Sequence, residues 1–435
     1  MELLDHFKAA LAVHWHPKRG HRPHRIWAER QLEATVKSAY RQVPYYREAF
    51  DRAGIDIASF SAADLGKLPF FTKNELQANF PAKLVAEGTQ LDRCKHSATT
   101  GSSGKAVNFV FHPRTYAYYL ATSLRVYTMI GYRPWHKIVY IKYTQVSTPK
   151  VGFGKFFQVA HIPSMIPVQE QIRRLREEKP DLLVGYASII LEVARNVTPA
   201  DLADIRPRFI SVNSEMSTQA QRDFIASVFD CPVYDEYSTE ETWMVASQCP
   251  HGSYHLFTDN VWVEFLDPQG NEVAPGEVGE IVLTTLRSPA MPFIRYRIGD
   301  LGRKGEGPCA CGSAFPVLKA FDGRADDAFV LPSGGRLPSL KLLNAFTTFI
   351  KSDPGLMREF RLVQEKVDQV LVKLVKGPEF AEERVQKLLQ RLQEVIREPV
   401  TMRVEYFDSL DREGRIKQKA ITSLVGKPLP AAEVA

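Results

Sequence analysis

Residues 168–186 read VQEQIRRLREEKPDLLVGY, a charged amphipathic stretch followed at once by a short apolar run. The first part predicts a helix (168–180), and DLLVGY (181–186) predicts a buried strand. The same alternation continues on both sides, with strands at KIVYIKY (137–143), RFISVN (208–213) and CPVYDEY (231–237), and a helix at STQAQRDFIASVF (217–229). Strands that alternate with helices predict βαβ units and a parallel sheet.

The sequence beyond this region changes character twice. From residue 261 it turns to strands and tight turns, as in VWVEFLD (261–267) and IVLTTL (281–286). Beyond about residue 326, three strand-like runs surround the amphipathic stretch 380–397. The predicted fold is therefore α/β. It has a large N-terminal domain (1–325) with mixed and parallel sheets and helices, and a small α+β C-terminal domain (326–435).

Composition narrows the function classes. The chain has 435 residues, 44% of them hydrophobic, and a net charge of only +6. It has no basic stripe interleaved with aromatics, which argues against a nucleic-acid binder, whereas the mild positive excess suits an enzyme of anionic ligands. No apolar run is long enough for a membrane span, and no secretory signal is evident. Five cysteines, an odd and low number, argue against a disulfide framework, so we expect a cytoplasmic protein.

The stretch HWHPKRGHRPHRIW (14–27) is rich in histidine and basic residues. It could contact a metal or a polyanion. The interpretation favoured here is a solvated N-terminal surface, which short charged runs usually form.

A loop rich in glycine and hydroxyl groups, SATTGSSGKAV (97–107), precedes the predicted parallel sheet. Its small residues let backbone N–H groups approach phosphate oxygens, and Lys105 adds a positive charge. The spacing differs from a Walker A loop, in which Gly-Lys is followed by Ser or Thr. A flexible Gly/Ser linker remains the alternative on this stretch alone.

The order of nine short motifs carries a resemblance that covers almost the whole chain. The motifs are AYRQVPYYREAF (39–50), LPFFTKNEL (68–76), TTGSSGK (99–105), PDLLVGYAS (180–188), NSEMS (213–217), EYSTEE (236–241), YRIGDLG (296–302), GRADD (323–327) and REGRIKQKA (412–420). In this order they resemble the adenylate-forming superfamily, and more closely its phenylacetate–CoA ligase branch of aryl-acid CoA ligases. The resemblance implies ATP-dependent activation of a small carboxylic acid, with an aromatic acid expected, to an acyl-adenylate, followed by transfer to coenzyme A.

The resemblance also implies roles for individual residues. Tyr237 would lie against adenine, Asp300 would accept hydrogen bonds from the ribose, and Glu241 would hold Mg²⁺ beside Glu240. The other residues expected around ATP are Thr100, Gly101, Ser102, Ser103, Gly104, Lys105, Ser214, Glu215, Ser238 and Arg324. Taken singly, Tyr237 could be a packing aromatic and Asp300 could cap a turn.

The C-terminal motif departs from the family pattern. Arg415 stands where the family has a lysine, and Lys417 follows two residues later. Either could meet the substrate, and an arginine would do so as a planar fork rather than a point charge. Asp326 would be the hinge about which the C-terminal domain turns between the two half-reactions.

The acid pocket that the resemblance implies would be lined by Tyr143, His161, Tyr186, Ser211 and Asn213. These polar and aromatic side chains suit an aromatic acid, such as a hydroxybenzoate or an aminobenzoate, better than a fatty chain. A homodimer is possible, because dimers are common in this branch.

Four residues have the chemistry of a metal site. Cys249 and His255 lie in CPHGSYH (249–255), and Cys309 and Cys311 lie in PCACG (308–312). Three cysteines and a histidine suit tetrahedral Zn²⁺ in a structural role, and some members of the resembled branch carry a similar set. Buried free cysteines are the alternative reading, and Cys94 and Cys231 are expected to be such packing residues.

Two other functions stay open. The adenylate could pass to the phosphopantetheine of a carrier protein or to an amine. The chain could also be a binding protein that is stabilised by zinc and has lost catalysis. This alternative rests on Arg415, which stands where the family has a lysine.

Overall fold

The computed structural model describes residues 9–14, 20–99, 107–143, 156–324, 327–352, 355–410 and 420–425. The chain divides into two compact units, each built from two separate segments. Unit 1 combines Met1–Arg133 with Tyr234–Phe321, and unit 2 combines Pro134–Val233 with Asp322–Ala435. The predicted domain boundary after residue 325 stays a prediction.

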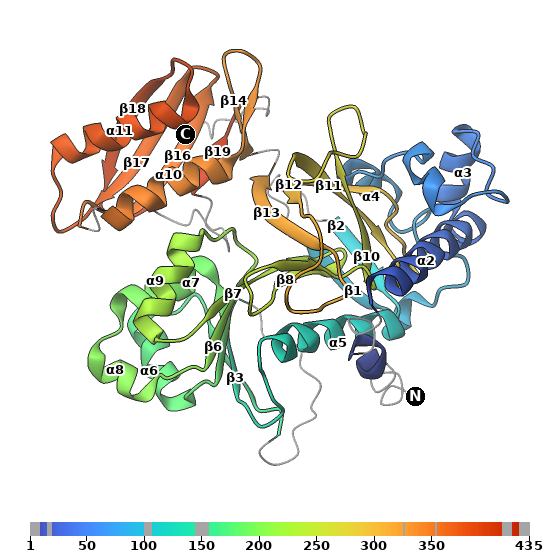
Figure 1. Ribbon diagram of the computed structural model, residues 1–435, viewed down its shortest axis with the longest axis horizontal. Coiled ribbons are helices and arrows are strands. Elements are labelled where there is room, and N and C mark those ends of the chain that lie inside the picture. The colour runs from blue at the N-terminus through green and yellow to red at the C-terminus, as the bar shows by residue number, and fades with distance from the viewer. Residues whose placement is uncertain are drawn as a thin grey trace. The chain divides into compact units, whose positions relative to one another are not determined.

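Unit 1 places an N-terminal group of helices beside a large sheet (Figure 1). Its helical elements are α2 (His21–Gln42), α3 (Pro44–Arg52), α4 (Lys73–Asn79), α5 (Pro113–Met129) and the short 3₁₀ turns η2 (Ala62–Lys67) and η3 (Leu91–Arg93). Its strands are β1 (Lys95–Thr99), β2 (Val107–Phe111), β7 (Val233–Thr239), β8 (Trp243–Gln248), β9 (Tyr254–Leu256), β10 (Val261–Leu266), β11 (Val278–Thr285), β12 (Tyr296–Lys304) and β13 (Val317–Arg324). Strands β1 and β2 form a separate antiparallel hairpin.

The large sheet of unit 1 has the strand order β10-β11-β12-β13-β9-β8-β7. Its short strand β9 pairs with both β8 and β13, so two distant segments meet on either side of it. One core of this unit is built from apolar residues of β8 to β11 and β13, with Val245, Val261 and Ile281 fully buried. The sheet thereby holds the ends of β7, β12 and β13 in fixed positions relative to each other.

Unit 2 contains the parallel sheet that the 168–186 stretch predicts (Figure 1). Its elements are β3 (Ile138–Lys142), β4 (Val159–Pro163), α6 (Val168–Glu178), β5 (Leu182–Tyr186), α7 (Ala187–Asn196), α8 (Pro199–Asp204), β6 (Phe209–Asn213) and α9 (Gln219–Phe229). The strand order is β6-β5-β3-β4, and every pair is parallel. Alternate residues of β3 and β6 pack beneath α6, α7 and α9, which sets the remaining residues on the opposite face.

The C-terminal part of unit 2 is a small α+β assembly. It consists of β14 (Phe329–Val330), β15 (Arg336–Leu337), α10 (Ser339–Ser352), β16 (Met357–Lys366), β17 (Gln369–Lys376), α11 (Glu382–Ile396), β18 (Thr401–Phe407) and β19 (Ile421–Ser423). Strands β18-β17-β16-β19 form one sheet. The apolar stripe of α11, with Val385, Leu388 and Leu392 fully buried, packs into the same core as α10 and this sheet.

The α/β fold predicted from the sequence is confirmed. One local expectation is wrong, because His24 does not lie on a solvated surface. It is 2% exposed, and its Nε2 lies 2.7 Å from Thr258 Oγ1. Within the described residues, no helix is long and apolar enough to cross a membrane.

Candidate functional site

An aromatic side chain and a carboxylate meet on the sheet of unit 1. The hydroxyl of Tyr237, on β7, donates to Asp300 Oδ2, on β12, at 2.6 Å. The Tyr237 ring packs against Phe321 of β13 with centroids 4.2 Å apart. The sheet order brings these strands together from distant parts of the chain. The pair combines a flat apolar surface with a strong hydrogen-bond acceptor, which suits a nucleoside.

A second carboxylate lies beside this pair. Glu241 is the second residue after β7, and its Oε1 accepts a hydrogen bond from the Tyr296 hydroxyl at 3.1 Å. Burial raises the pKa of Glu241, and the negative charges of Glu240 and Asp300 act in the same direction. Glu240 itself is exposed. Carboxylate oxygens are ligands that a hard cation such as Mg²⁺ prefers, and one or two of them commonly bind it beside phosphate oxygens, so Glu241 fits the predicted metal.

A β-bulge in β12 lies between Tyr296 and Asp300, the two residues of this strand that contact Glu241 and Tyr237. Asp300 lies opposite Ile281 of β11, whereas the next residue of β11, Val282, lies opposite Arg297. Residues 298 and 299 are therefore extra in β12, and Gly299 has φ of +79°, which side chains adopt at a cost.

The predicted acid-pocket residues lie in unit 2, at or near the carboxyl ends of its parallel strands. Tyr186, Ser211 and Asn213 are buried, His161 is partly buried, and Tyr143 is 48% exposed. Ile210 and Val212 pack beneath the helices, so Ser211 and Asn213 project from the opposite face. Ligand sites in open parallel sheets commonly form at such strand ends.

Lys142, a residue that was not among the predicted site residues, lies among these side chains. It is the last residue of β3, and its Nζ donates to Asn213 Oδ1 and to Ser214 Oγ. The same Nζ lies 4.2 Å from the centroid of the Tyr186 ring. The signal for it was present, since a lysine that ends the apolar run IVYI occupies the carboxyl edge of a buried strand.

The predicted nucleotide residues after β6 show two features. Ser214 has φ of +66°, a left-handed conformation that is uncommon outside glycine and concentrates at functional sites. Glu215 accepts a hydrogen bond from the backbone N–H of Ser188 at 3.0 Å. That N–H lies in the first turn of α7, so the carboxylate caps a helix N-terminus.

The remaining predicted residues are placed as follows. Ser238 lies on β7 and Arg324 ends β13, and both are partly buried. The phosphate-loop residues 100–105, the hinge residue Asp326, and Arg415 and Lys417 lie outside the described residues. Their roles stay predictions.

The four predicted metal ligands come together in unit 1. The ligand atoms of Cys249, His255, Cys309 and Cys311 all lie within 4.8 Å of one another. Cys249 follows β8, His255 lies on β9, and the other two precede β13. Cys94 and Cys231 are buried in other parts of the core, as expected.

The geometry of this cluster fits Zn²⁺. Tetrahedral coordination with Zn–S bonds of about 2.3 Å sets two sulfurs about 3.8 Å apart, and the Sγ atoms of Cys249 and Cys309 are 3.8 Å apart. His255 Nδ1 lies 3.3 Å from the Phe315 carbonyl, and its Nε2 lies 3.1 Å from Cys311 Sγ. A Nδ1–H donated to a carbonyl orients Nε2 for metal, and burial lowers the pKa of His255, which favours the neutral ring.

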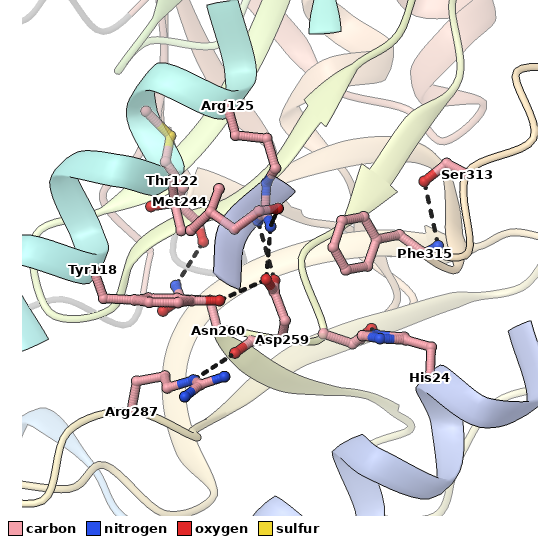
Figure 2. Close-up of polar contacts among 12 residues, drawn as sticks. His24, Tyr118, Thr122, Arg125, Met244, Asp259, Asn260, Arg287, Ser313 and Phe315 are labelled. Atoms are coloured by element: carbon pink, nitrogen blue, oxygen red, sulfur yellow. Dashed lines mark hydrogen bonds and ion pairs between the residues drawn. The ribbon is translucent and has the colours of Figure 1, made fainter. Parts of the chain in front are cut away.

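A buried charged network, shown in Figure 2, contacts the segment that carries two of the predicted metal ligands. Arg125 of α5 contacts both carboxylate oxygens of Asp259, at 2.6 and 3.0 Å, and the Tyr118 hydroxyl donates to the same carboxylate at 2.6 Å. The Arg125 guanidinium lies 4.8 Å from the ring centroid of Phe315, whose carbonyl faces His255. The loop that carries two metal ligands thus also packs on this ion pair.

Comparison with known proteins finds relatives that are similar in sequence over most of the chain. Over 372 residues the chain is 28% identical to a phenylacetate–coenzyme A ligase of Aromatoleum evansii, and the match covers 80% of this chain and 81% of that relative. The chain is a homologue of phenylacetate–coenzyme A ligases. Another such ligase, from Escherichia coli strain K12, is 28% identical over 327 residues, which are 71% of this chain and 73% of the relative.

Two further comparisons concern the C-terminal part of the chain and its overall fold. Residues 336–423 match the CapK C-terminal domain family. The crystal structure of a 2-hydroxyisobutyryl-CoA ligase, in its postadenylation state with an acyl-AMP named R3-HIB-AMP, superposes with a TM-score of 0.78. That superposition covers 93% of this chain and 90% of the other at 18% identity, so it supports the fold.

Proposed function

We propose that this protein is an AMP-forming acid–thiol ligase. It activates a small carboxylic acid with ATP to an acyl-adenylate and then transfers the acyl group to coenzyme A. The observation that carries the proposal is the Tyr237–Asp300 pair beside Glu241 in unit 1, because it combines a surface for a base, an acceptor for a ribose and a carboxylate for a cation. The homologous ligases of A. evansii and E. coli support the reaction class.

Different residues of the described structure would bind the adenine, the ribose and the magnesium ion of the nucleotide. The Tyr237 ring would stack on adenine, and Asp300 would exchange the tyrosine hydroxyl for the ribose hydroxyls as its hydrogen-bond partners. Glu241, kept in place by Tyr296, would be a Mg²⁺ ligand. Bound Mg²⁺ would offset the charge of the triphosphate and of the leaving pyrophosphate.

Other residues would bind the carboxylic acid and control the access of the coenzyme A thiol. His161, Tyr186, Ser211 and Asn213 would hold the acid. Arg415 or Lys417 would approach the reacting carboxylate during adenylation, and rotation about Asp326 would then remove them and admit the thiol. The preferred acid under this proposal is aromatic, because the candidate pocket combines Tyr186 with hydrogen-bonding groups.

Zinc would have a structural role in this enzyme. Cys249, His255, Cys309 and Cys311 would occupy all four positions of a tetrahedral ion, which leaves no open position for substrate. The ion would hold β9 in register with the loop before β13.

The test is pyrophosphate release from ATP and Mg²⁺ over a panel of aromatic and aliphatic acids, each with and without coenzyme A. Release confined to a few aromatic acids, with the thioester detected by mass, would support the whole proposal. Release without a thioester would point to a carrier-protein or amine acceptor. ATP binding without release for any acid would favour a binding protein that has lost catalysis.

The hinge can be tested separately. Asp326→Pro is expected to retain acid-dependent pyrophosphate exchange and to lose thioester formation, because proline restricts the backbone rotation that the second step needs. Asp327→Pro is the neighbouring control. Equal loss of both half-reactions in Asp326→Pro would contradict the hinge assignment.

A further inference from the structure

The face of the parallel sheet opposite its helices is polar near the carboxyl ends of the strands. In β3, Val139 and Ile141 pack beneath the helices, so Tyr140 and Lys142 project from the other face. By the same alternation Ser211 and Asn213 of β6 share that face. A charged side chain therefore lies among hydroxyl, amide and aromatic groups at the place where open parallel sheets bind ligands.

The side chain of Lys142 is held there by contacts from the ends of two other strands. Asn213, the last residue of β6, and Ser214, which follows it, accept hydrogen bonds from its Nζ, and the Tyr186 ring, at the end of β5, faces the same ammonium at 4.2 Å. The backbone carbonyl of Lys142 lies 3.1 Å from His161 Nε2 of β4. The contacts of Nζ fix the long side chain, so less conformational entropy is lost when a ligand binds it.

The groups that hold Nζ in these contacts are uncharged: an amide oxygen, a hydroxyl and an aromatic face. Ser214 adopts its left-handed conformation in the same place, with φ of +66°. Backbone strain of this kind persists where the surrounding structure imposes it, and it concentrates at binding sites. The arrangement presents a fixed ammonium to whatever occupies the strand ends.

We infer that Lys142 is a specificity-determining residue that selects carboxylic acids carrying a second oxygen acceptor, such as a hydroxyl, keto or carboxylate group. The inference rests on the proposed function, and it narrows the substrate class. An ammonium group has three donors and no acceptor, so it favours an oxygen and gains little from an aromatic amine, whose nitrogen is mainly a donor. Of the two aromatic classes expected from the sequence, Lys142 selects hydroxybenzoates over aminobenzoates.

The reacting carboxylate is a less suitable partner for Lys142. The resemblance already supplies a cation for that group, Arg415 or Lys417, which must leave before the thiol attacks. Lys142 is the last residue of a sheet strand and is fixed by three contacts, so it suits a part of the acid that stays bound through both half-reactions.

The experiment compares isosteric acid pairs, the 2-, 3- and 4-hydroxybenzoates against the corresponding aminobenzoates, in wild type, Lys142→Met and Lys142→Gln. In wild type, kcat/KM for pyrophosphate release is expected to favour the best hydroxy acid over its amino partner by about tenfold or more, the value of a hydrogen bond to a charged group. In both variants that ratio is expected to fall towards one.

Lys137→Met is the matched control, because Lys137 lies just before the start of the same strand and pairs with Glu178. It should keep the wild-type ratio. Thermal unfolding of each variant separates a loss of selectivity from a loss of folded protein. An unchanged ratio in Lys142→Met would overturn the inference, as would equal loss for hydroxy and amino acids, which would place Lys142 on the carboxylate that both share.

Calorimetric binding of the same acids without ATP keeps the test independent of turnover. Failure of the proposed function would appear as acid binding without pyrophosphate release. Within that result, a Lys142-dependent preference for the hydroxy acid supports the inference. Absence of any such preference in binding overturns it.

Discussion

Two aspartates of unit 1 differ in the partners that their carboxylate oxygens contact. Asp259 is fully buried and contacts the guanidinium of Arg125 through both oxygens (Figure 2). Asp300 is partly buried, and its Oδ2 accepts a hydrogen bond from the neutral hydroxyl of Tyr237. The contact described for Asp259 is with a cation, and the contact described for Asp300 is with a neutral donor, which a ligand hydroxyl can replace.

We propose that Asp259 is a structural carboxylate and that Asp300 is a ligand-binding one. A buried ion pair cannot lose one partner without leaving an uncompensated charge. A partly exposed carboxylate with a tyrosine partner can exchange that partner for a ribose hydroxyl at small cost. Four predictions test this division, from the largest expected effect to the smallest.

Asp259→Asn is expected to lower the free energy of unfolding by about 3–5 kcal/mol, because Arg125 would stay buried without its counter-charge. Denaturant unfolding measures it. Asp300→Asn is the matched variant, with an expected change of less than about 1 kcal/mol. The double variant Arg125→Met/Asp259→Leu should recover much of the lost free energy of unfolding. Similar destabilisation by Asp259→Asn and Asp300→Asn would contradict the assignment of a structural role to Asp259 alone.

Removal of zinc should destabilise the fold around the buried Arg125–Asp259 pair. The reason is that Phe315 contacts Arg125 through its ring and the predicted metal ligand His255 through its carbonyl. Free zinc at about a hundred times its dissociation constant would stabilise the fold by about 2.7 kcal/mol, and chelation would remove this. Thermal unfolding and metal analysis by mass spectrometry provide the measurement. Cys311→Ser should lose the zinc dependence, whereas Cys94→Ala should retain it. Zinc-independent unfolding of the wild type would contradict the metal assignment.

Asp300→Asn should weaken binding of ATP by about tenfold to a hundredfold, since hydrogen bonds to a charged acceptor are worth about 1.5–3 kcal/mol. Calorimetric titration with ATP measures the affinity, and the unfolding curve confirms the fold. ATP affinity equal to that of the wild type would place the ribose elsewhere.

Tyr237→Phe should have the smallest effect. The ring and its contact with Phe321 would remain. The hydroxyl is the group that the ribose would displace from Asp300, so its loss should leave the ATP affinity within about twofold of the wild-type value, a change of less than about 0.5 kcal/mol. Tyr237→Ala should weaken ATP binding, because the stacking surface disappears. Equal effects of the two substitutions would exclude stacking as the role of the ring.

The sequence predicted those parts of the fold that depend on local pattern. The helix at 168–180 and the strand at 181–186 are observed as α6 and β5 within two residues, because amphipathic spacing and apolar runs are read locally. The order of strands in the sheet of unit 1 is not local. It follows from pairings such as β9 with β13, between segments about 60 residues apart, which no single stretch encodes.

The candidate site divides in the same way. The four metal ligands could be predicted because cysteine and histidine have few other reasons to recur together. Lys142 was missed because its partners lie 71 and 72 residues later in the chain. The Arg125–Asp259 pair was missed for the same reason, since 134 residues separate its members. The sequence around one member of either pair does not identify the other member.

The chain enters unit 1, passes through part of unit 2, returns to finish unit 1 and then completes unit 2. During synthesis, Met1–Arg133 therefore emerges long before Tyr234–Phe321, which carries the large sheet of unit 1. At the usual rates of translation, the ribosome needs about 10–40 s to add the residues between 133 and 321. The first helices and the β1–β2 hairpin must stay soluble through that interval, so premature termination near residue 233 would release a nascent chain in which neither unit can close.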